Sequence, residues 1–151
     1  MPELPEIESL TRGLAKLIPG KAIAEVKCGQ PKAIAPAVEQ FESLARGQVI
    51  SVLRRAKSFI FELNHGAIWF HMGLSGRVLY ETKPTQDDSA MIALTFDDGA
   101  RFSIVRSFMG HAHFLSPDES AQEWQRFGWE PLDSDFTVAI LEDILSRFPR
   151  A

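Results

Sequence analysis

Residues 48–72 read QVISVLRRAKSFIFELNHGAIWFHM and hold three short apolar runs in succession. The runs are rich in Val, Ile, Phe and Trp, which favour strands because their side chains pack well on a pleated surface. Asn64-His65-Gly66 separates the last two runs and is typical of a tight turn. Because one strand follows another with no helix between them, this stretch predicts a mostly antiparallel sheet rather than a doubly wound fold.

The same pattern continues on both sides of this stretch. About eight strands are expected, at residues 21–28, 48–55, 58–63, 67–72, 76–81, 90–96, 100–105 and 112–115. Helices are expected after Pro5, where apolar residues recur with the spacing of one helix face, and at residues 36–46, from 117 onward and at 136–148. The pattern therefore predicts one α+β, mainly β domain over residues 1–151.

The composition is that of an ordinary globular domain, with 45% hydrophobic and 24% charged residues among 151. No apolar run approaches the roughly 18 residues of a membrane-spanning helix, so no membrane partner is expected. Cys28 is the single cysteine, which excludes an internal disulfide and a cysteine-rich zinc site. The acidic N-terminus is unlike a signal peptide, and the chain is expected in the reducing cytoplasm.

The net charge of −4 argues against strong nucleic-acid binding by this chain alone, because neutralising phosphates needs clustered Lys and Arg. The basic residues are local and gather at residues 27–32, 54–57 and 101–106. They are either scattered surface charges or a patch that steers a polyanion.

The first residues of the chain can carry chemistry. If Met1 is removed, Pro2 presents a secondary amine, and an α-amino group is partly unprotonated and nucleophilic near neutral pH. Such an amine can add to the C1′ carbon of a sugar and form an iminium. Glu3 and Glu6 could converge on the same helix end, one to protonate the sugar ring oxygen and the other to position substrate or water. The alternative is structural, because Pro and Glu are also favoured at a helix N-terminus.

Four motifs in order carry a resemblance to a known family. PELPEIE at residues 2–8 resembles the opening of the formamidopyrimidine-DNA glycosylases of the Fpg/Nei type. Residues 54–57, RRAK, precede an apolar strand and resemble the family's segment with an essential lysine on a strand turn. HMGLSG at 71–76 resembles H-x-G-M-S-G, and GWEPL at 128–132 resembles G-P-E-P-L. Together these motifs extend over nearly the whole chain.

The resemblance implies a two-layered antiparallel β-sandwich flanked by helices, with an N-terminal helix that carries the active-site end. It implies excision of oxidised or formamidopyrimidine bases from damaged double-stranded DNA, followed by β,δ-elimination at the abasic site, and it leans towards formamidopyrimidine lesions. Pro2 would be the nucleophile, Glu3 the proton donor, and Glu6 would help to hold the flipped nucleotide. Lys57 would contact phosphate and the lesion, a role that suits a compact point charge. The C1′ carbon becomes accessible only when the nucleotide leaves the stack.

The resemblance also implies DNA contacts outside the N-terminus. His71 would lie near the DNA backbone, although a histidine that ends an apolar strand is as often a hydrogen-bonded structural residue. Leu74 stands where the family has Met, as an apolar wedge that fills the gap left by the flipped base. Arg106 and Phe108 would contact the orphaned base and intercalate a ring.

The segment around Arg106 departs from the family pattern R-Y-T-D-P-R-R-F-G. Ile104-Val105 replaces the Asp-Pro pair and Ser107 replaces the second Arg. Family members continue with a helix–two-turn–helix unit and usually a zinc finger, so neither is expected within these residues, and no metal or cofactor is expected in this chain. A chain without those parts should bind DNA weakly. The alternative function is a non-catalytic or truncated domain that serves as a binding or interaction module.

Overall fold

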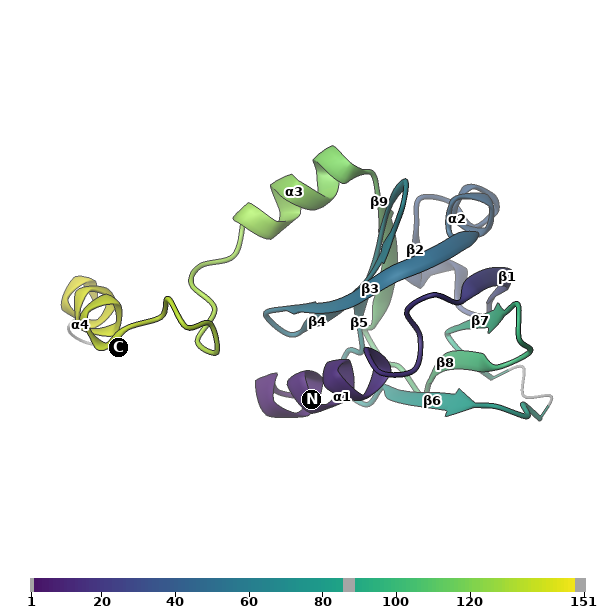
Figure 1. Ribbon diagram of the computed structural model, residues 1–151, viewed down its shortest axis with the longest axis horizontal. Helices are drawn as coiled ribbons and strands as arrows, with labels where there is room; N and C mark the ends of the chain where they lie inside the picture. The colour runs from purple at the N-terminus through teal and green to yellow at the C-terminus, as the bar shows by residue number, and fades with distance from the viewer. Residues whose placement is uncertain (1, 86–88, 149–151) are drawn as a thin grey trace.

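The computed structural model describes residues 2–85 and 89–148 (Figure 1). The helices are α1 (Leu4–Leu14), α2 (Val38–Leu44), α3 (Pro117–Gln125) and α4 (Val138–Arg147), with a 3-10 turn at Pro31–Ala33. The strands are β1 (Ala22–Cys28), β2 (Ile34–Ala35), β3 (Gly47–Arg55), β4 (Ser58–Leu63), β5 (Gly66–His71), β6 (Arg77–Glu81), β7 (Ile92–Phe96), β8 (Arg101–Val105) and β9 (His111–Leu115).

Within these ranges, one continuous sheet of nine strands bends into two layers. The order is β2-β9-β5-β4-β3 in the first layer and β1-β7-β8-β6 in the second, and a short pairing of β1 with β3 joins them. The layers meet face to face, because the ring of Phe102 on β8 lies between 5.0 and 5.9 Å, centre to centre, from the rings of Phe59, Phe61 and Phe70. The expected α+β, mainly β sandwich is therefore confirmed.

The structure has one strand more than the eight that the sequence indicated. The additional strand, β2, is two residues long and pairs with β9 in the parallel direction, whereas the other pairings are antiparallel. Two residues are too few to show an alternation of apolar and polar positions, so the pattern could not reveal it.

Helix α1 carries the N-terminus to one end of the sandwich (Figure 1). Its buried residues, Ile7, Thr11 and Leu14, recur at helical spacing, and the helix lies along β3. The Glu6 carboxylate accepts the backbone N–H of Glu3 at 3.0 Å. This contact satisfies a main-chain donor at the start of the helix, as in a capping box.

Helix α3 covers the outer face of the first layer. The ring of Trp69 on β5 lies 6.3 Å from that of Trp124 and 6.2 Å from that of Phe127, and its indole N–H donates to Ser120 Oγ at 3.0 Å. Trp124 from α3 and Phe127 from the segment just after it therefore pack against the same ring. This packing fixes the segment that follows the helix, which reaches the candidate site.

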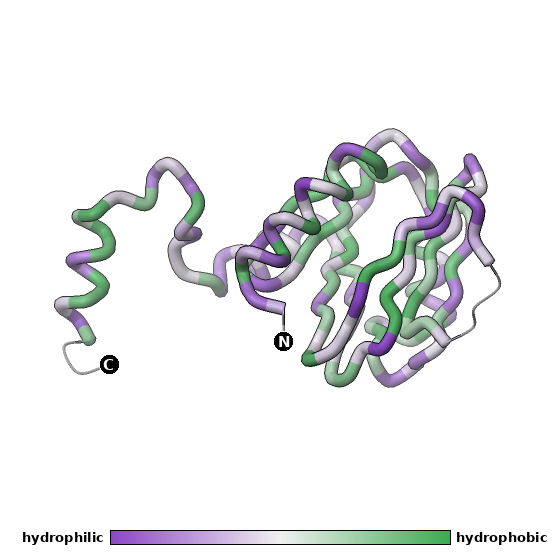
Figure 2. Tube along the Cα trace, turned by 90° about the horizontal axis from the view of Figure 1, so that it is seen from below, coloured by the Kyte–Doolittle hydropathy of each residue, from purple (hydrophilic) through white to green (hydrophobic). Residues whose placement is uncertain are grey.

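Helix α4 stands apart from the sandwich (Figures 1 and 2). None of its described residues is buried. Three of its large apolar residues are exposed, Val138, Leu141 and Leu145, and so is Phe148 at its C-cap. The sequence pattern predicted the helix itself, and Thr137 caps its N-terminus by accepting the N–H of Ile140. Among the described helices, none is long and apolar enough to cross a bilayer.

Candidate active site

The charged residues predicted at the N-terminus meet at one end of the sandwich. Lys57 Nζ lies 2.8 Å from Glu3 Oε2, and both side chains are partly exposed to solvent. Glu3 also donates its backbone N–H to the carboxylate of Glu6. Pro2 is half-buried and directly precedes Glu3. Lys57 and the first turn of α1, predicted from motifs 50 residues apart in the chain, thus form one exposed polar cluster.

Lys57 projects from a tight turn, which we call the charged turn and which consists of Ala56 and Lys57. Arg55 pairs with Ser58 across β3 and β4, so only these two residues link the strands. The backbone of Ala56 is left-handed, with φ of +50°. Residues with a side chain rarely adopt this conformation, so the surroundings must hold the turn in place.

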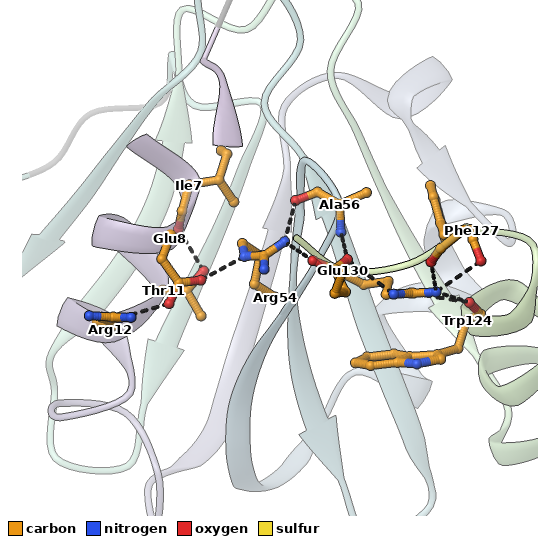
Figure 3. A network of polar contacts seen from close by, with 11 residues as sticks. Ile7, Glu8, Thr11, Arg12, Arg54, Ala56, Trp124, Phe127 and Glu130 are labelled. Atoms are coloured by element: carbon orange, nitrogen blue, oxygen red, sulfur yellow. Dashed lines mark hydrogen bonds and ion pairs between the residues drawn. The ribbon is translucent and has the colours of Figure 1, made fainter. Parts of the chain in front are cut away.

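A network of buried charges holds the charged turn (Figure 3). The Glu130 carboxylate accepts the N–H of Ala56 at 2.6 Å and lies 2.6 Å from Arg54 Nη1 and 3.2 Å from Arg55 Nη1. Arg54 Nη1 also donates to the carbonyl of Ala56 at 3.0 Å, and Arg54 Nε lies 2.6 Å from Glu8 Oε2 on α1. The hydrogen bond from Arg54 is the main reason that the pKa of Glu8 is lowered. Helix α1, the charged turn and the GWEPL segment are thereby joined.

Arg55 extends the same network to the segment after α3. Its guanidinium donates to the carbonyls of Trp124, Phe127 and Gly128 at 2.8 to 3.2 Å. It also lies over the Trp124 and Phe127 rings, 5.1 and 5.7 Å from their centres. A planar fork of donors that also stacks on rings is a property of arginine that lysine lacks.

The sequence reasoning missed this network. Glu8, Arg54, Arg55 and Glu130 lie within the matched motifs, but none had been given a role. One signal was present in the sequence: two adjacent arginines end a strand that is otherwise apolar, and side chains so placed need a partner when they are buried. The identity of that partner, 75 or 76 residues away, came only from the fold.

The predicted DNA contacts lie on two loops, residues 72–76 after β5 and residues 106–110 after β8, which together we call the double loop. The N–H of Leu74 donates to the carbonyl of Phe108 at 2.9 Å. Ser75 Oγ donates to the carbonyl of Arg106 at 2.7 Å, and the buried Ser107 donates its hydroxyl to the carbonyl of Met72 at 3.1 Å. Ser107, which stands in place of the family's second Arg, therefore holds the two loops together.

The side chains of the double loop that were predicted to touch DNA point outward. Leu74 is 46% exposed and Phe108 63% exposed, and Arg106 is also exposed. Gly73 allows the close approach behind them, because a Cβ atom on Gly73 would lie 2.1 Å from the carbonyl oxygen of Phe108. The result is an exposed apolar surface on a closely packed backbone.

His71 lies between the charged turn and the double loop. The pairing of Phe59 with Phe70 places the start of β4 and the end of β5 at the same end of the sheet. Burial, and then the nearby charge of Lys57, lower the pKa of His71, and its Nδ1 accepts the N–H of Gly73 at 3.1 Å. His71 therefore has the hydrogen bond expected of a structural residue. Its contact with the DNA backbone stays a prediction.

The single cysteine and the possibility of a metal site also bear on the chemistry. Burial raises the pKa of Cys28 to about 11, so its thiol is not a nucleophile near neutral pH. Among the residues that the structure describes, no group of three or more His, Cys, Asp or Glu side chains could hold a metal ion.

Comparison with known proteins identifies the family of the chain. The family model for the formamidopyrimidine-DNA glycosylase N-terminal domain matches residues 1–109. The formamidopyrimidine-DNA glycosylases of Shouchella clausii and Bacillus subtilis are 35% and 36% identical to the chain over its whole length. The chain spans about 57% of the length of these relatives.

Solved structures show the same fold. The Lactococcus lactis Fpg in complex with DNA that contains an abasic site has a TM-score of 0.83 and 23% identity, over 95% of this chain and 56% of that one. MutM in complex with DNA that contains carbocyclic 8-oxo-G has a TM-score of 0.83 and 24% identity, over 97% of this chain and 57% of that one. The family model, which describes the N-terminal domain, and the curated relatives establish that the chain belongs to the formamidopyrimidine-DNA glycosylase family.

Proposed function

We propose that this chain is the catalytic domain of a DNA glycosylase and abasic-site lyase, and that it acts on oxidised or formamidopyrimidine bases in double-stranded DNA. The observation that carries the proposal is the contact of Lys57 with Glu3, directly beside Pro2, at an exposed end of the sandwich. Its relatives named formamidopyrimidine-DNA glycosylase support the same chemistry.

In the proposed reaction, the nitrogen of a terminal Pro2 bonds to C1′ while the bond from C1′ to the damaged base breaks. The base leaves with the electron pair of that bond and takes up the proton that the amine nitrogen loses. Glu3 gives a proton to the ring oxygen, the ring opens, and the nitrogen lone pair forms the iminium. The iminium acidifies C2′, and loss of that proton breaks the C3′–O bond. A second elimination then breaks the C5′–O bond, and water releases the amine.

The other residues position the substrate in this proposal. Glu6 helps to hold the flipped nucleotide, and its carboxylate already fixes the first turn of α1. Lys57 leaves Glu3 to contact phosphate or the lesion when DNA binds. The DNA backbone is contacted by His71, and the gap left by the flipped nucleotide is filled by Leu74. The orphaned base is contacted by Arg106 and Phe108, with the ring of Phe108 inserted beside it. We also propose that the protein acts in the cytoplasm, where a lone thiol such as Cys28 stays reduced.

The test is borohydride trapping on an abasic oligonucleotide, with protein that begins at Pro2 and a matched protein that retains Met1. Reduction converts an iminium into a stable covalent adduct. We expect an adduct with a free Pro2 and its loss when Met1 is retained, because an amide nitrogen is not nucleophilic. No adduct with either protein, or equal adducts with both, would overturn the proposal.

A second candidate function is a non-catalytic DNA-binding or interaction module. The net charge of −4 and the loss of a basic residue at Ser107 favour it, because both weaken contacts to phosphate. The departure at Ile104-Val105 favours it as well, because it changes the geometry of the predicted wedge. Binding of the abasic duplex without any covalent adduct would support this alternative.

A further inference from the structure

Backbone strain in this molecule is confined to its two candidate-site loops. Over residues 2–85 and 89–148, the non-glycine residues with a left-handed backbone are Ala56, Arg106 and Met109, with φ of +50°, +53° and +61°. The first lies in the charged turn and the other two in the double loop. Strain of this kind persists where the surrounding structure over-determines the conformation, and it gathers at functional sites.

Met109 combines this strain with unusual exposure. Its side chain is 70% exposed, more than that of Phe108 at 63% or Leu74 at 46%. Glycine is the residue that a left-handed backbone favours, and a polar residue is the usual choice for an exposed loop. Neither folding preference therefore explains a methionine at this position.

The backbone around Met109 is tightly packed. A Cβ atom on Gly73 would lie 2.8 Å from the carbonyl carbon of Met109 and 2.5 Å from the N of Gly110. A Cβ atom on Gly110 would lie 1.8 Å from Ser107 Oγ and 2.8 Å from the carbonyl oxygen of His71. The main chain that presents Met109 is thus ordered before any partner arrives, which lowers the entropic cost of binding.

The position of the double loop indicates its partner. Both it and the charged turn emerge from the end of the sheet where β4 starts and β5 ends. A nucleotide whose C1′ reaches Pro2 has left its stack and has opened a gap in the duplex. An unbranched thioether side chain adapts well to such an irregular gap, and the exposed Arg106 beside it suits a polyanion.

We propose that Met109 is a third insertion residue, which enters the opened base stack of a damaged duplex together with Leu74 and Phe108. The inference rests on the proposed function for the nature of the ligand. It assigns to Met109 a positioning role: the side chain supports the extruded nucleotide and does not touch the reacting atoms.

The experiment measures the fluorescence of 2-aminopurine next to an uncleavable abasic analogue in duplex DNA, at saturating protein. This signal reports insertion into the stack and requires no covalent chemistry. We expect Met109→Gly and Met109→Gln to reduce the signal change on the order of tenfold, and Met109→Leu to retain it, since an apolar wedge is what the stack accepts. Val138→Ala on α4 is the control for exposed apolar surface, because Val138 is 73% exposed.

Thermal melting separates this role from a structural one. Met109→Gly removes a strained side chain, so its melting temperature should not fall. An unchanged fluorescence response in Met109→Gly, or an equal loss in Val138→Ala, would overturn the inference while borohydride trapping could still succeed. Failure of trapping together with a signal that depends on Met109 would discard the chemistry of the proposed function and retain the insertion.

Discussion

The charged turn and the double loop both hold a left-handed backbone in place, but they do so with different interactions. Each presents exposed side chains from a left-handed backbone. The charged turn depends on the buried carboxylate of Glu130 between two arginines, whereas the double loop depends on main-chain hydrogen bonds and on glycines that allow close approach. The first arrangement should be sensitive to loss of a single charge, and the second to a single added carbon atom.

The largest effect is expected from Glu130→Ala, which removes the charge at the centre of the charged turn. Two buried guanidinium groups would each lose their Glu130 contact and keep only their other contacts, and the N–H of Ala56 would lose the carboxylate that accepts it. Breaking a buried ion pair on one side costs about 3–5 kcal/mol of the free energy of unfolding. Urea denaturation measures this loss, and Glu25→Ala, at an exposed glutamate on β1, is the matched control with almost no change. A decrease in the free energy of unfolding no larger than that caused by breaking a surface ion pair would show that the network does not hold the turn.

Gly73→Ala tests the double loop in the corresponding way. The added Cβ atom would lie 2.1 Å from the carbonyl oxygen of Phe108, on a backbone with φ of +67°. We expect a loss of about 2 kcal/mol in the free energy of unfolding, because the loops must separate. Gly13→Ala, where a Cβ atom meets nothing within 4 Å, is the control and should be neutral or stabilising. Equal stability of the two variants would contradict the close packing described above.

Ala56→Gly should act in the opposite direction. Glycine adopts φ of +50° without steric cost, so the substitution should raise the free energy of unfolding by up to about 1 kcal/mol. The matched control is Ala121→Gly, at an exposed position within α3, which should lower it because glycine is unfavourable inside a helix. Chemical denaturation measures the change in the free energy of unfolding for both variants. A change of the same sign in both would argue against strain in the charged turn.

The smallest effect concerns pH at the junction of the two regions. The His71 and His111 rings stack at 5.2 Å between centres, and burial lowers the pKa of His111 to about 4. Because the folded state favours the neutral imidazole, the unfolded chain binds more protons between about pH 4 and the ordinary histidine pKa near 6.5. Stability from this group is complete above that window and decreases as the pH falls through it.

His111→Gln should therefore flatten the dependence of stability on pH within this window. The ring is only about half buried, so solvent screens part of the effect. Denaturation midpoints at several pH values between 4 and 7 measure the slope. An unchanged slope in His111→Gln would argue against a neutral, partly buried imidazole at this position.

Much of the fold followed from local pattern, and the limits of that pattern are equally clear. The strands of residues 48–72 could be predicted because their apolar runs and turns are local properties. Roles for Glu3 and Lys57 were expected only through the family motifs, and the contact between the two side chains came from the fold. The buried pairs of Glu130 could not be predicted, because side-chain pairing across so long a stretch of chain depends on how the layers fold. Met109 was overlooked, since a left-handed backbone at a methionine leaves no trace in composition.

The long sequence separation between Glu130 and its partners also has a consequence for folding during synthesis. The N–H of Ala56 that Glu130 accepts lies 74 positions earlier in the chain. When helix α1 and the β3–β4 hairpin have left the ribosome, Arg54 can already pair with Glu8, but Arg55 and the N–H of Ala56 still lack the carboxylate of Glu130. The charged turn is held by its full set of contacts only after the GWEPL segment emerges, so we expect a translational pause before that point to leave a positively charged hairpin that lacks the Glu130 contacts.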